Sequence, residues 1–212
     1  MSSIAAPDVS GLPAAISGPS AWYGPAMLRD TSWLEEVTAA EVAEIEAAIE
    51  QVEANPAVNI AALRAADFPL PQLGARLARI RSEVLHGRGF ALLRGLPVRR
   101  WTRQQAAIAF LGIGAHFGSA RSQNAKGHVL GHVKDMGLSS SDPNVRIYQT
   151  HERQSFHTDS CDIVGLLCLQ TAKSGGRSAL VSSVTIFNEM RRRRPDLLRL
   201  LFDPIETDRR GE

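Results

Sequence analysis

Cysteines are few in this chain and neither charge predominates, which excludes several classes of protein. The two cysteines among 212 residues, Cys161 and Cys168, are too few for a disulfide framework or a zinc knuckle. Their odd separation would place them on opposite faces of one strand, and we expect buried, reduced thiols in a cytoplasmic protein. The formal net charge of +2 indicates no nucleic-acid partner, and we interpret the run Arg191–Arg194 as a solvated helix end.

Long apolar runs are missing as well. No stretch of about 18 apolar residues is present, so we expect no transmembrane helix and no membrane partner. The N-terminus has no basic region followed by an apolar one, so we expect no signal peptide. Hydrophobic residues still make up 44% of the chain, which is enough to bury a core, and the length predicts one domain with an N-terminal extension.

The sequence changes character near residue 38. Residues 1–30 are rich in Ala, Ser, Gly and Pro, and we expect an irregular arm or flexible lead-in there. Thr38 and Glu41 have the spacing of a capping box. Apolar residues then recur three and four apart over 42–52, with glutamates between them. This pattern predicts an amphipathic helix that ends before Pro56.

Further helices and strands are predicted from apolar spacing and from the positions of the glycines. Helices are expected over 73–86, 102–110 and 184–193, the last capped by Ser182 or Ser183. Strands are expected over 90–95, 146–150, 163–169 and 179–183. The first of these should open the sheet, the third should be buried, and the fourth should follow the Gly-rich turn at 174–178 as a hairpin.

One short stretch carries side chains that bind metals. His157 and Asp159 are two residues apart, and side chains in an extended strand alternate between faces, so both would project the same way. An imidazole beside a carboxylate makes two-thirds of the 2-His-1-carboxylate triad of non-haem Fe(II) oxygenases. Aspartate and glutamate account for 22 of the 212 residues, so such a pair also arises by chance and its surroundings must decide.

Those surroundings carry a resemblance to a known family. The sequence His157-Thr158-Asp159, the apolar run 163–169 and the turn Gly175-Gly176-Arg177-Ser178 together resemble the core of the TauD/TfdA family of Fe(II)/2-oxoglutarate-dependent dioxygenases. The resemblance covers roughly residues 85–212. It has two departures: Arg177 stands where an acid is usual, and the spacing from Asp159 to Ser178 is shorter than in the taurine enzyme.

The resemblance implies a fold and a division of the chain. We expect an α+β protein with an incomplete double-stranded β-helix, the jelly roll of these oxygenases, preceded by N-terminal helices. Residues 1–70 would form the arm and helical extension, and residues 71–212 would form a partial dioxygenase domain. Strand edges left without partners would favour association with other chains, so a homo-oligomer is possible.

The resemblance also implies cofactors and site residues. His157 and Asp159 match the first two iron ligands, and Ser178 matches the hydroxyl residue that contacts 2-oxoglutarate. Fe(II), 2-oxoglutarate and O2 would then oxidise, or specifically hydroxylate, a small organic substrate with release of succinate and CO2. Family members shape their substrate pockets with the region that corresponds to 119–146. In that region Gln123, Lys126 and His128 are the candidate substrate-binding residues.

Two groups that the family requires are not found in this sequence. The family places its second histidine ligand and its 2-oxoglutarate arginine well downstream, yet no histidine follows Asp159. His151 lies six residues before His157, about 20 Å along a strand, and is too far to replace the missing ligand. His128 and His132 are four apart, but the glycines around them argue against a helical metal site.

Three interpretations follow. We expect the chain to be an N-terminal fragment of a dioxygenase, inactive alone. A non-catalytic binding or regulatory module of the same fold is the alternative, and an unrelated globular protein with a coincidental His-Thr-Asp is the third. The sequence does not name the substrate.

Overall fold

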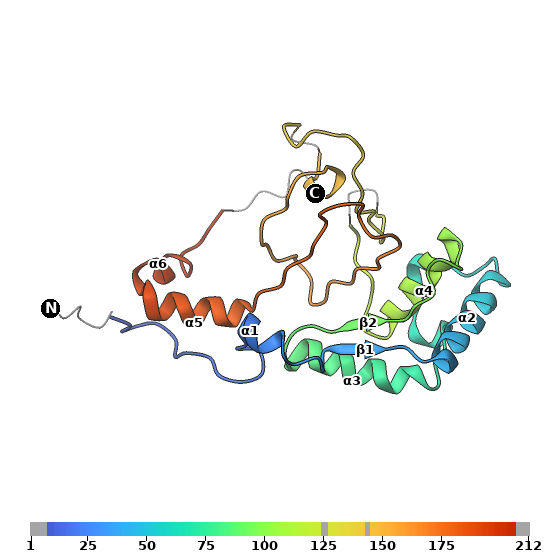
Figure 1. Cartoon of the computed structure of the whole chain (residues 1–212), viewed down its shortest axis with the longest axis horizontal. Coiled ribbons are helices and arrows are strands. Elements are labelled where there is room, and N and C mark those ends of the chain that lie inside the picture. Colours follow the sequence, from blue (N-terminus) through green and yellow to red (C-terminus); the bar gives the residue numbers. More distant parts are fainter. Residues whose placement is uncertain (1–7, 124–126, 143–144, 207–212) are drawn as a thin grey trace. The chain divides into compact units, whose positions relative to one another are not determined.

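The computed structural model of the chain describes residues 8–123, 127–142 and 145–206. Its regular elements are helices and two short strands (Figure 1). In chain order they are α1 Gly24–Met27, β1 Leu34–Glu36, α2 Ala39–Glu53, the 3-10 turns η1 Ile60–Ala62 and η2 Ala65–Asp67, α3 Leu73–His86, β2 Leu92–Arg94, α4 Arg103–Ala115, the 3-10 turn η3 Ile147–Gln149, α5 Ser183–Arg193 and α6 Pro195–Leu200. No helix in these ranges combines the length and apolarity needed to cross a membrane.

Two compact units divide the elements between them. The first unit contains the residues up to Ile45, Leu70–Arg100 and the residues from Cys168 onward. The second contains Glu46–Pro69 and Trp101–Leu167. A domain boundary at residue 70 stays a prediction.

The first unit is built on a parallel pair of strands and on helix α3. Strand β1 pairs with β2 in the register Leu34 to Leu92, Glu35 to Leu93 and Glu36 to Arg94. The strand predicted over 90–95 is confirmed as β2, but it does not open the sheet because β1 precedes it. Helix α3 spans the predicted 73–86, and its apolar stripe is buried at Leu73, Leu77 and Ile80.

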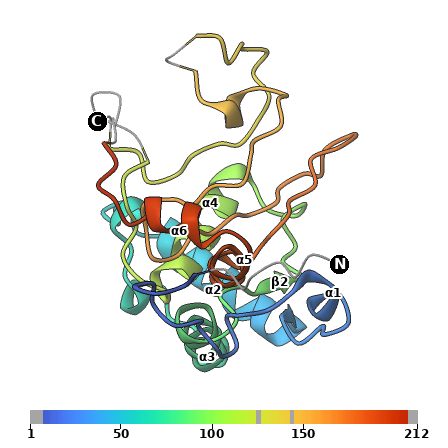
Figure 2. The ribbon, with the colours of Figure 1, turned by 90° about the vertical axis from the view of Figure 1, so that its left-hand side faces the viewer.

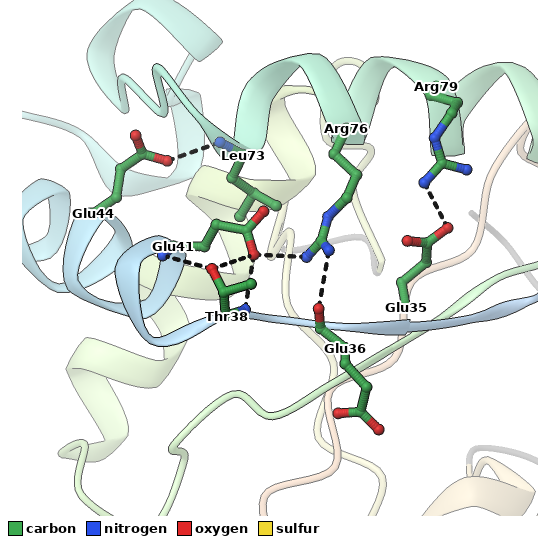
Figure 3. Close-up of polar contacts among 8 residues, drawn as sticks. All are labelled: Glu35, Glu36, Thr38, Glu41, Glu44, Leu73, Arg76 and Arg79. Atoms are coloured by element: carbon green, nitrogen blue, oxygen red, sulfur yellow. Dashed lines mark hydrogen bonds and ion pairs between the residues drawn. The ribbon is translucent and has the colours of Figure 1, made fainter.

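A network centred on one carboxylate joins these elements (Figure 3). Glu41 Oε2 accepts hydrogen bonds from the backbone N–H and the hydroxyl of Thr38, at 2.8 and 2.9 Å, which confirms the predicted capping box. Arg76 Nη2 donates to the same oxygen at 2.8 Å, and Arg76 Nη1 donates to the Glu36 carbonyl at 2.9 Å. The start of α2, the end of β1 and the first turn of α3 are thus tied together by charge-assisted bonds.

A second glutamate caps α3 from outside the helix. The two carboxylate oxygens of Glu44 accept from the backbone N–H groups of Gln72 and Leu73 at 2.8 and 3.0 Å. These are N–H groups at a helix start, which have no acceptor within the helix. The glutamates between the apolar positions of α2 therefore include structural residues.

The second unit is organised around Phe68, which is fully buried. Helix α4 contacts η1 and η2 and is capped by reciprocal bonds between Thr102 and Gln105. The helix was predicted over 102–110 but continues to Ala115. A Cβ at Gly112 would overlap the ring of Phe68, so a glycine here lets the ring pack against the helix. His116 Nε2 lies 2.9 Å from the Phe68 carbonyl.

Three of the predicted strands are wrong. Residues 147–149 form the 3-10 turn η3, and residues 163–169 and 179–182 are irregular. Val164 and Leu166 are 54% and 76% exposed, so the run predicted to be buried is largely on the surface. Backbone groups of an apolar run form a strand only against a neighbouring strand, and the described residues contain only the β1–β2 pair.

The remaining corrections and confirmations concern single residues. Cys161 and Cys168 are both exposed and form no disulfide, so the prediction of buried thiols is wrong. The prediction failed because the buried strand that was to carry them does not form. Ser182 rather than Ser183 caps α5, by accepting from the Thr185 N–H at 2.9 Å. A mixture of helix and strand agrees with the expected α+β class, while the jelly roll remains an expectation drawn from the family.

Substitution of Gly112 tests the packing in the second unit. Gly112→Ala should lower the free energy of unfolding by about 1–3 kcal/mol, because the added methyl group forces the Phe68 ring to move within a packed core. Gly114 is two residues further along α4 and has open space around it. Gly114→Ala should therefore stabilise the protein by about 0.5 kcal/mol. Chemical denaturation measures the free energy of unfolding of both variants. Equal changes in the two variants would contradict the packing of Phe68 against Gly112.

Substitution of Glu41 tests the network in the first unit. Glu41→Ala should lower the free energy of unfolding by about 2–4 kcal/mol, because it removes the cap of α2 and one partner of a partly buried guanidinium. Glu50 is an exposed glutamate on the same helix, and no hydrogen bond or ion pair of its side chain is found in the described part of the chain. Glu50→Ala should change stability by less than about 0.5 kcal/mol. A Glu41→Ala variant as stable as the Glu50→Ala variant would show that the network around Glu41 does not stabilise the protein.

Candidate metal site

The segment that leads to His157 is fixed by local hydrogen bonds in the second unit. Lys134 N–H donates to the Tyr148 carbonyl at 3.1 Å, and Met136 N–H donates to the Gln149 carbonyl at 2.8 Å. Thr150 is buried, and its hydroxyl donates to the Ile147 carbonyl. These bonds end at Glu152, whose backbone N–H donates to the Thr150 hydroxyl at 3.1 Å.

The hydrogen bonds of His157 define its tautomer. Nδ1 lies 2.9 Å from the Ser155 carbonyl, and a carbonyl can only accept, so the proton belongs on Nδ1. Nε2 then carries a lone pair, which accepts from the Gln154 amide at 3.2 Å. An imidazole with Nδ1 held on a backbone carbonyl, so that the lone pair lies on Nε2, is an arrangement found in metal-binding histidines.

Asp159 lies on the same side as His157. Its Oδ1 is 3.9 Å from His157 Nε2, so the two side chains project together, while their role as iron ligands stays a prediction. The predicted setting is wrong, because the pair lies on an irregular segment with side chains 48% and 53% exposed. Two neighbouring ligands on one metal ion lie about 3 Å apart, given metal–ligand bonds of about 2.1 Å. A side-chain rotation that brings His157 Nε2 and Asp159 Oδ1 roughly 1 Å closer together would therefore let both atoms bind one ion.

The pair could supply two of the three protein ligands of a facial triad. Within the described ranges, no group of three or more His, Cys, Asp or Glu side chains is placed to hold a metal ion. His128 and His151 are both exposed, and neither joins the pair. His157 Nε2 and an oxygen of Asp159 are thus the groups that could hold iron here.

Three of the other predicted site residues, Ser178, Gln123 and His128, lie within the described part of the chain. Ser178 is exposed in the first unit, after a turn in which Gly175 and Gly176 have φ values of 68° and 63°. The Gln123 side chain donates to the Arg121 carbonyl at 3.1 Å, and His128 is exposed. Lys126 lies outside the described residues. Contact of Ser178 with 2-oxoglutarate and of the others with substrate stays a prediction.

Two positioning residues were missed by the sequence-based reasoning. Gln154 and Ser155 contact the two ring nitrogens of His157, one through its side-chain amide and the other through its carbonyl. A carbonyl contact has no signature in the sequence, because every residue has a carbonyl. Gln154 offered one weak signal, an amide side chain three residues before a candidate ligand.

Comparisons with known proteins agree with this chemistry. Residues 53–212 match the family described as taurine catabolism dioxygenase TauD, TfdA family. The chain is 30% identical over 198 residues to FR-33289 synthase of Streptomyces rubellomurinus, an alignment that covers 93% of this chain and 58% of that protein. It is 32% identical over 188 residues to taurine hydroxylase-like protein SAT17 of Stachybotrys chartarum, covering 85% of this chain and 49% of that protein.

The chain thus spans about half the length of the curated relatives that it matches. The family match covers most of the chain and includes His157, Asp159 and Ser178. On this evidence the chain belongs to the TauD/TfdA dioxygenase family.

Proposed function

We propose that this chain is part of an Fe(II)/2-oxoglutarate-dependent dioxygenase that oxidises a small organic substrate and releases succinate and CO2. The observation that carries the proposal is the pair His157 and Asp159, whose Nε2 and Oδ1 atoms lie 3.9 Å apart. The name of the SAT17 relative contains the word hydroxylase, which favours hydroxylation as the reaction. The substrate itself remains open.

The residues of the chain would have distinct tasks. His157 Nε2 and Asp159 would bind iron, and the Ser155 carbonyl would hold the imidazole ring in the required tautomer and orientation. The Gln154 amide would leave Nε2 as the metal binds, since both compete for one lone pair. The Ser178 hydroxyl would contact 2-oxoglutarate. Bound iron would supply the activation of O2 that the substrate's oxidation requires.

The remaining ligand is part of the proposal. No histidine follows Asp159 in this sequence, and the relatives are longer than the part that aligns. We therefore propose that the second imidazole and the arginine that binds 2-oxoglutarate come from protein outside these 212 residues. A cytoplasmic location and a homo-oligomer remain predictions.

A non-catalytic binding module is the second candidate function. One observation favours it. In the part of the chain that the structure describes, His157 Nε2 and Asp159 Oδ1 lie 3.9 Å from each other, and no third metal-binding side chain joins them. Such a module would bind a small molecule of the same class without turning over 2-oxoglutarate. Metal affinity depends on the full ligand number, so a two-ligand site should bind Fe(II) weakly.

Succinate release separates the two candidates. The product of the complete reading frame, supplied with Fe(II), O2, 2-oxoglutarate and candidate substrates, should form succinate, while the 212-residue chain should not. His157→Ala and Asp159→Ala should each lower turnover at least about 100-fold, because each removes a metal ligand. Ser178→Ala should raise the KM for 2-oxoglutarate, while Ser174→Ala, at an exposed serine of the same turn, should leave it unchanged.

Two outcomes would contradict the dioxygenase proposal. Turnover that survives His157→Ala would show that the iron is held elsewhere. A complete protein that binds Fe(II) and 2-oxoglutarate but forms no succinate with any candidate substrate, coupled or uncoupled, would favour the binding module.

A further inference from the structure

The N-terminal segment lies along the last two helices of the first unit (Figures 1 and 2). We call residues 8–23 the strap. Side chains of α5 and its neighbours donate hydrogen bonds to its backbone carbonyls. The carbonyls that accept them belong to Asp8, Ser10, Pro13, Ile16, Ser20 and Trp22. Six carbonyls over fifteen residues accept these bonds, so the helices bind the strap mainly through its backbone. A segment rich in Ala, Ser, Gly and Pro can therefore dock without an apolar pattern.

The strap runs antiparallel to α5. Near the end of the helix, Arg191 Nε donates to the Pro13 carbonyl at 2.8 Å. In the middle, Asn188 makes two bonds with Ile16, accepting from its N–H at 2.9 Å and donating to its carbonyl at 2.8 Å. At the start, Thr185 Oγ1 donates to the Trp22 carbonyl at 2.7 Å. These three contacts follow an antiparallel order along the helix.

Charged groups reinforce the end of the strap. The Tyr23 hydroxyl donates to Glu189 Oε1 at 2.7 Å, and Arg192 and Arg193 donate to Oε2 at 2.7 and 2.6 Å. The hydrogen bonds from Arg192 and Tyr23 lower the pKa of Glu189 to about 2. Trp22 adds an aromatic anchor, because its ring packs edge-on against Phe90 with centroids 5.3 Å apart.

Ser182 and Thr185 hold the start of α5 to the strap. Both are buried, and each hydroxyl donates to a strap carbonyl, Ser182 to Ser20 and Thr185 to Trp22. The Ser182 hydroxyl also caps the helix by accepting from the Thr185 N–H. A buried hydroxyl without a partner is costly, so docking of the strap and formation of the first turn of α5 should be coupled.

The segment before α5 has no comparable anchor. Among the described residues, those from 164 to 181 make no hydrogen bond to another segment. Ser178 stands four residues before Ser182 in this stretch. The first tertiary hydrogen bonds after Ser178 are therefore those between the strap and the start of α5.

We propose that the strap, which lies outside the region matched by the family, is a conformational clamp that fixes the start of α5 and with it the turn that carries Ser178. Ser182 and Thr185 are its positioning residues. The clamp itself stands on the contacts above, and only its importance for 2-oxoglutarate rests on the proposed function of Ser178.

Amide NMR on the 212-residue chain tests the clamp without metal or 2-oxoglutarate. Thr185→Val keeps the shape of the side chain and removes the bond to the Trp22 carbonyl. Exchange of the Ile16 and Ala21 amides, both hydrogen-bonded in the strap, should become roughly five- to tenfold faster. The heteronuclear NOE of residues 178–182 should fall toward values typical of a flexible coil.

Two matched variants control the experiment. Thr185→Ser retains the hydroxyl and should restore both readouts. Ser183→Ala alters the exposed serine beside the cap and should change neither. Two results would overturn the clamp. One is faster amide exchange in α5 with unchanged exchange at Ile16 and Ala21. The other is faster exchange at Ile16 and Ala21 with an unchanged heteronuclear NOE of residues 178–182. Because the readout is independent of turnover, either result leaves the proposed function to be judged by succinate release.

Discussion

A β-strand satisfies its backbone N–H and C=O groups only against a neighbouring strand, and this requirement shapes the described part of the chain. Strand β2 forms because β1 lies beside it over three residue pairs. The run from Ile163 to Leu169 has the composition of a buried strand but no partner there, and Leu166 is left 76% exposed. His157 is consequently held by local hydrogen bonds rather than by a sheet, with Asp159 3.9 Å away. The stretch up to Ser178 would depend on the proposed anchor at α5.

Local bonds nevertheless hold one of the two proposed iron ligands, His157, with the other, Asp159, close beside it. The Ser155 carbonyl fixes the proton on Nδ1 of His157 and leaves Nε2 facing Asp159. At 3.9 Å and about half exposed, the pair would supply two ligands of the proposed facial triad and is not a closed site. This state is what the chemistry predicts for two ligands without a third, because a bound metal ion is what draws such side chains together.

The parts that the sequence predicted well are those whose signals are local. The capping-box spacing of Thr38 and Glu41 predicted the start of α2, and the spacing of Leu73 and Leu77 predicted α3. The strands at 146–150 and 163–169 were predicted wrongly because their formation depends on partners distant in sequence. The strap was predicted as irregular but not as docked, since α5 binds its carbonyls and carbonyls leave no pattern in a sequence. The proximity of His157 and Asp159 followed from their spacing, whereas the contact of Gln154 with His157 needed coordinates.

The most direct test of the central claim is the protonation state and metal response of His157, observed by nitrogen-15 NMR of the imidazole rings in the 212-residue chain. The structure predicts the Nδ1-protonated tautomer in the free protein. It also predicts that titrated Zn2+, used as a diamagnetic probe, shifts the Nε2 resonance of His157, and that Asp159→Ala weakens the shift. An Nε2-protonated ring, or zinc-induced shifts at His128, His132 or His151 without one at His157, would contradict the claim that His157 and Asp159 form the metal-binding pair.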